Sequence, residues 1–142
     1  MAYDFERKQV RYEGSAAPSS ESLTHAAIYE SDAEAGAVVH RHDSKLWAAV
    51  LNQAPTTSKA AAYGTPEMAY EIMRLFNGTD VRSRKMLVMA GHEGGIVTFG
   101  KNLGDAFDVL MRARELPQPC DAGRQYAGYS GQNARAPRQH AE

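Results

Sequence analysis

Hydrophobic residues recur along the chain with two different spacings, which predict a mixed fold of helices and strands. Short apolar runs bounded by polar residues or glycine predict strands over residues 9–13, 37–42, 85–90 and 96–99. Hydrophobic residues three or four positions apart predict helices over residues 21–32, 45–53, 66–77 and 103–114. The glycine-rich link between the last two strands predicts an antiparallel hairpin. This pattern is typical of an α/β protein.

Residues that favour the start of a helix stand before each helical pattern. One serine of the Ser19-Ser20 pair, then Asp43, Thr65 and Asn102, can accept a hydrogen bond from the backbone of the first turn. The apolar stripe that should face the core in the last helix consists of Leu103, Phe107, Leu110 and Met111.

Length, charge and cysteine content exclude several classes of protein. The 142 residues are enough for one domain with a sizeable core. A net charge of −1 gives no electrostatic reason to expect nucleic acid or an anionic membrane as a partner. No apolar run could span a bilayer, the first residues show no signal sequence, and the single cysteine rules out an internal disulfide. We therefore expect a cytoplasmic protein.

Composition also divides the chain. We expect residues 1–9 to be a flexible lead-in, residues 10–116 to form the domain, and residues 117–142 to be a disordered tail. The last segment contains no Leu, Ile, Val, Phe or Met, so it cannot bury enough apolar surface to offset the entropy of ordering.

His40 and His42 end the second predicted strand with a single residue between them. Side chains alternate faces along a strand, so both imidazoles should point the same way. Such a pair is half of a zinc or iron site, but it is also common among ordinary surface residues. His92, in the turn of the predicted hairpin, could supply a third ligand, because a catalytic zinc site typically has three protein ligands and an open position. Spacing alone leaves both interpretations open.

Four residues near the first helix each allow two interpretations. A glutamate in a first turn usually only stabilises the helix, yet Glu21 is also a candidate general base. Hydroxyls at a helix start usually act as caps, but Ser19 and Ser20 could instead bind an anion there. His25 shares a helix face with Glu21 and is more simply a packing or hydrogen-bonding residue than a metal ligand.

Five segments follow one another in an order and spacing that resemble the class II aldolase/adducin head family, to which fuculose-phosphate aldolase belongs. They are PSSE (18–21), THAAIY (24–29), AVVHRH (37–42), YGTPEMA (63–69) and MAGHEGGIVTFG (89–100). The resemblance implies a three-layer α/β/α fold around a mostly antiparallel central sheet, here without the family's usual N-terminal part. It also implies a homo-oligomer, because proteins of the family are often tetramers.

The resemblance further implies a role for each candidate residue. His40, His42 and His92 would bind zinc or another divalent transition metal. Glu21 would be the catalytic acid/base, and Ser19 and Ser20 would contact the substrate phosphate.

The implied activity is that of a metal-dependent lyase of the aldolase type. Its substrate would be a small ketose phosphate or related sugar, cleaved through a metal-stabilised enediolate with a glutamate as acid/base. Within enzymes, epimerisation or dehydration of a sugar phosphate is the alternative. Outside that class, the alternatives are a non-catalytic adducin-like head domain and an inactive metal-binding remnant.

Overall fold

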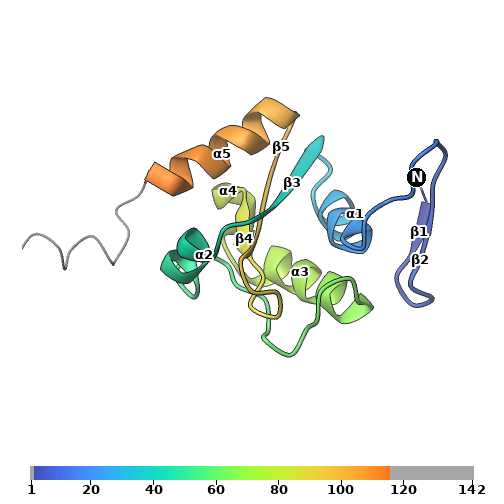
Figure 1. Cartoon of the computed structure of the whole chain (residues 1–142), viewed down its shortest axis with the longest axis horizontal. Helices are drawn as coiled ribbons and strands as arrows, with labels where there is room; N and C mark the ends of the chain where they lie inside the picture. The colour runs from blue at the N-terminus through green and yellow to red at the C-terminus, as the bar shows by residue number, and fades with distance from the viewer. Residues whose placement is uncertain (1, 116–142) are drawn as a thin grey trace, which may run out of the picture.

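A three-stranded antiparallel sheet lies between two layers of helices in the computed structural model, which describes residues 2–115 (Figure 1). Strands β3 (Ala37–His42), β5 (Gly95–Gly100) and β4 (Met86–Val88) are adjacent in that order, with β5 in the centre. Strands β4 and β5 form the predicted hairpin. The α/β class with an antiparallel sheet is confirmed.

One face of the sheet is covered by α1 (Ser22–Ser31), α3 (Pro66–Gly78) and the short α4 (Val81–Arg84), of which α4 was not predicted. The fully buried residues of this layer and the strands beneath it include Ile28, Ile72, Leu87, Val97 and Phe99. Because alternate residues of a strand face opposite ways, Val97 and Phe99 point to the same layer.

The opposite face is covered by α2 (Ser44–Val50) and α5 (Leu103–Glu115). Leu46 and Leu110 pack there against Val88 and Ile96 of the sheet. Figure 1 shows α5 and α3 on opposite sides of the strands. The two hydrophobic cores therefore fix the sheet from both sides.

Three of the four predicted helix caps are confirmed. The side chains of Asp43, Thr65 and Asn102 each accept a hydrogen bond from the backbone N–H three residues further on. The predicted serine cap of α1 is wrong. The helix begins at Ser22, and the residue before it, Glu21, has φ −84° and ψ 6° rather than the extended backbone of a usual N-cap, with no side-chain cap.

The predicted apolar stripe of α5 is also wrong in part. Leu110 is buried, but Leu103 and Phe107 are 65% and 49% exposed, and the helix packs on the sheet through Ala106 instead. The carbonyl of Ala106 accepts a hydrogen bond of 2.8 Å from the Thr98 hydroxyl of β5. A small residue allows this close approach, and the larger side chains on either side are turned outward.

Residues 1–9, expected as a flexible lead-in, include a strand. Strand β1 (Ala2–Asp4) pairs antiparallel with β2 (Gln9–Arg11), and this hairpin stands at one end of the molecule beyond α1 (Figure 1). The Tyr3 hydroxyl donates a hydrogen bond to Glu30 of α1. That hydrogen bond, together with burial and the carboxylate charge, raises the pKa of Tyr3 to about 12 and keeps the donor protonated.

The tail predicted over residues 117–142 lies outside the described residues. Within residues 2–115, no helix has both the length and the apolar character that crossing a membrane requires.

Candidate metal centre

His40 and His42 extend from the same face of β3, as the strand periodicity predicted. They lie opposite Val97 and Gly95 of the central strand, and their ring centroids are 5.0 Å apart. Val38, two residues before His40 on the same face, packs against the core beneath α1 and α3. The histidine pair therefore continues the face of the sheet that these two helices cover.

His92 reaches the pair from the turn between β4 and β5. Its N–H donates to the Met89 carbonyl at 3.2 Å, and its own carbonyl accepts from the Gly95 N–H at 2.8 Å. A Cβ atom at Gly95 would lie 2.8 Å from the His92 ring, so only glycine leaves room for the imidazole here. The Trp47 indole of α2 also donates to the Met89 carbonyl, at 3.0 Å, and fixes this turn against the sheet.

The three histidines converge. One nitrogen of each ring lies within 4.8 Å of the corresponding atoms of the other two. The His92 centroid is 4.4 Å from that of His42 and 5.4 Å from that of His40. Zinc–nitrogen bonds of about 2.1 Å place tetrahedral ligands roughly 3.4 Å apart, so modest ring rotations would complete a site. The Nε2 atom of His40 is buried and has no hydrogen-bond partner among the described residues, as expected of a ligand atom.

The protonation of two of these imidazoles, those of His40 and His92, suits metal binding. Burial lowers the pKa of His40 to about 4, against the opposing effect of the nearby Glu21 carboxylate. Burial also lowers the pKa of His92, again opposed by Glu21. Both rings are therefore neutral near pH 7, and neutral imidazole is the form that binds a metal.

Glu21 is buried beside this cluster, with only 5% of its surface exposed. Its Oε2 atom accepts a 2.7 Å hydrogen bond from the Thr24 hydroxyl, one turn along α1. Its Oε1 atom is buried and has no partner among the described residues. His25, next along the helix, has a pKa lowered mainly by burial and lies outside the cluster of three histidines.

A cavity of about 560 Å³ borders the cluster. Its lining residues come from the N-terminal hairpin, the approach to α1 and the loop before α3; they are Lys8, Val10, Pro18, Ser19, Ser20, Ser22, Leu23, Ala62, Tyr63 and Gly64. The Tyr63 ring connects the two regions, because its centroid lies 4.3 Å from that of His92. No hydrogen bond among the described residues uses the hydroxyl of Ser19, Ser20 or Tyr63.

The family model described as Class II Aldolase and Adducin N-terminal domain matches residues 1–118. The chain belongs to the class II aldolase and adducin family. A comparison with curated proteins found no match.

In this class II aldolase and adducin domain, the structure brings together four of the six residues to which the family resemblance gives a role: the three histidines and Glu21. Ser19 and Ser20 lie in the adjoining cavity. Sequence reasoning missed Lys8 and Tyr63. Tyr63 is part of the YGTPEMA segment, but the sequence gives it no role of its own. Nothing local marks Lys8, because its place depends on how the N-terminal hairpin packs.

Proposed function

We propose that this domain is a metal-dependent lyase of the aldolase type, acting on a small ketose phosphate or related sugar. The observation that carries the proposal is the convergence of His40, His42 and His92 beside the buried carboxylate of Glu21. Membership of the class II aldolase and adducin family supports it. The three imidazoles would hold zinc or another divalent transition metal.

A bound metal would act as a Lewis acid that polarises the carbonyl and hydroxyl oxygens of the substrate. Glu21 would accept a proton at Oε1 and return it later in the reaction, while the Thr24 hydroxyl holds the other carboxylate oxygen in place. The hydroxyls of Ser19 and Ser20 would donate to the phosphate of the substrate. In these roles, Glu21 Oε1 and the two serine hydroxyls would gain hydrogen-bond partners that no other described residue supplies.

The test combines metal analysis with an activity screen of the full chain. Purified wild type should contain about one zinc per chain, since the cluster offers the three ligands of a catalytic site. His42→Ala should lose that zinc together with retro-aldol cleavage of a ketose-phosphate panel. His42 is exposed, so its removal should leave the fold intact. Glu67→Gln, a change on the exposed start of α3, serves as a control that should keep both zinc and activity.

Two other results would refute the lyase. Absence of zinc and of any other divalent transition metal from wild type would favour a non-catalytic adducin-like head domain. Stoichiometric zinc without cleavage, epimerisation or dehydration of any panel member would favour an inactive metal-binding remnant. The homo-oligomer implied by the family stays a prediction, which sedimentation equilibrium can test.

A further inference from the structure

The N-terminal hairpin is anchored to two helices on the side of the molecule that carries the cavity. Tyr3 of β1 is bound to Glu30 of α1. The Phe5 ring packs against Tyr70 of α3, with centroids 6.4 Å apart, and is partly buried against the core. The hairpin is therefore held against the body of the molecule by contacts from both helices, and the position of its turn is determined.

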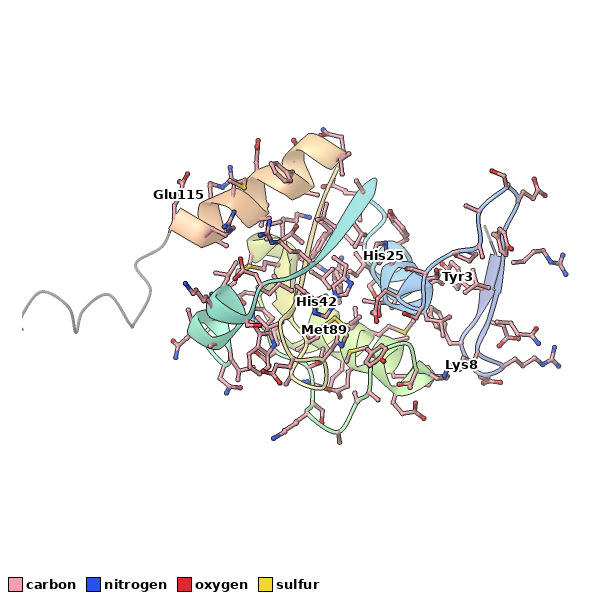
Figure 2. The ribbon with its side chains drawn as sticks, viewed as in Figure 1. Tyr3, Lys8, His25, His42, Met89 and Glu115 are labelled. Atoms are coloured by element: carbon pink, nitrogen blue, oxygen red, sulfur yellow. The ribbon has the colours of Figure 1, made fainter. Side chains whose placement is uncertain are left out.

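That turn places Lys8 at the cavity. Lys8 has a positive φ of 55°, and its N–H donates to the Phe5 carbonyl at 3.3 Å, which closes the turn. In Figure 2 the labelled Lys8 side chain lies between the hairpin and α3. It lines the same cavity as Ser19, Ser20 and Tyr63.

The lining of this cavity carries positive charge only. Lys8 is the only charged residue in its lining, and no carboxylate is among the others. Within residues 2–115, no ion pair includes Lys8, whereas its neighbour Arg7 lies 3.9 Å from Asp4. An ammonium group beside several free hydroxyl donors favours an anion with several acceptor oxygens.

We propose that Lys8 supplies the positive charge that binds the phosphate group of the substrate, so that the N-terminal hairpin completes an anion site begun by Ser19 and Ser20. This inference rests on the proposed function. The Tyr63 ring lines the cavity and also lies against His92. One small molecule beside this ring could therefore contact both the cavity and the histidine cluster. The phosphate would sit at the hairpin end and the reacting carbons at the histidine end.

The experiment measures binding of inorganic phosphate to the full chain by calorimetry at low ionic strength. Lys8→Gln should raise the dissociation constant about tenfold, the size expected for one lost charge-assisted hydrogen bond. Lys8→Arg, which keeps the charge, should stay within about twofold of wild type. Lys45→Gln removes an equal charge from the exposed surface of α2, outside this cavity, and should also stay within about twofold.

The inference would be overturned if wild type and Lys8→Gln bound phosphate equally, or if Lys8→Gln and Lys45→Gln lost the same affinity. It would also be overturned if wild type bound no phosphate. A second arm repeats the titration in the His42→Ala background. If the effect of Lys8→Gln disappears there, phosphate binds at the metal rather than in the cavity, and the inference is wrong. The content of zinc and other divalent transition metals, measured on the same samples, tests the lyase separately. Phosphate binding that depends on Lys8 in a chain without any divalent transition metal would support the anion site and refute the lyase.

Discussion

Only one of the two carboxylate oxygens of Glu21 has a hydrogen-bond partner among the described residues. Oε2 is bound to Thr24, whereas Oε1 is buried without a partner. A charge that merely stabilised the helix dipole would be exposed or would accept from the first backbone N–H groups, and Glu21 does neither. An unsatisfied buried oxygen is costly, so its presence favours the catalytic interpretation that the sequence had left open.

Replacement of this carboxylate separates metal binding from proton transfer. Glu21→Gln keeps the shape of the side chain and should retain zinc, but it should lower turnover at least about a hundredfold, because an amide cannot exchange the proton. Metal analysis and turnover of the best panel substrate check this, with Glu67→Gln as the matched control. Unchanged turnover in Glu21→Gln would show that another group transfers the proton.

Among the elements, features set by neighbouring residues could be predicted, and features set by packing could not. The caps Asp43, Thr65 and Asn102 depend only on the backbone three residues ahead, which the sequence specifies directly. The buried face of α5 depends instead on how closely the helix approaches β5. Ala106 permits that approach, and this leaves Phe107 exposed despite its apolar character.

Asp32, at the C-terminal end of α1, joins that helix to α4 and the start of β4. Its side chain is 8% exposed, and the carboxylate lies 3.0 Å from the Lys85 ammonium and 3.8 Å from the Arg82 guanidinium. Burial by itself would raise the pKa of Asp32. Hydrogen bonds from Lys85 and the Glu34 N–H, with the two cationic charges, outweigh it and lower the pKa below its usual value.

The pH dependence of stability follows from this shift. Because the folded-state pKa of Asp32 is lowered, its contribution is fully present above the unfolded value of about 3.9 and is lost as the pH falls through the folded-state value. Asp32→Asn should therefore reduce the free energy of unfolding at pH 7 by about 1–3 kcal/mol. The difference from wild type should shrink in acid, as followed by urea denaturation at several pH values.

The control for this prediction is Asp80→Asn. Asp80 pairs with Arg84 at 2.7 Å, but both side chains are about half exposed to solvent, so the change should cost less than about 1 kcal/mol. An equal effect of the two substitutions, or a cost for Asp32→Asn that does not depend on pH, would contradict the role given to Asp32.

At the scale of the whole molecule, the three-histidine cluster assembles residues that are far apart in the chain. The sequence could show that His40 and His42 share a face, because strand periodicity determines it. Their approach to His92 depends on the register of β3 with β5, on the turn between β4 and β5, and on the Trp47 contact to Met89. The glycine-rich sequence predicts that turn, but neither the strand register nor the Trp47 contact is visible as a local pattern. Spacing alone therefore could not decide between a metal site and surface histidines.

A metal that joins these elements should stabilise the whole fold. Zinc at about a hundredfold excess over its dissociation constant would contribute about 2.7 kcal/mol, which corresponds to several degrees in melting temperature. Thermal unfolding with and without a chelator should therefore differ by that amount in wild type. His92→Ala should unfold at nearly the same temperature under both conditions, and a chelator effect as large as that of wild type would show that zinc binds elsewhere.

The pairing of β3 with β5 has a consequence for how the protein refolds. His40 faces Val97 and His42 faces Gly95 in the native register. A slip of one residue would turn both imidazoles to the opposite side of the sheet, away from His92. Zinc uptake during refolding would therefore report the native strand register, because only molecules with that register can assemble the three-histidine cluster.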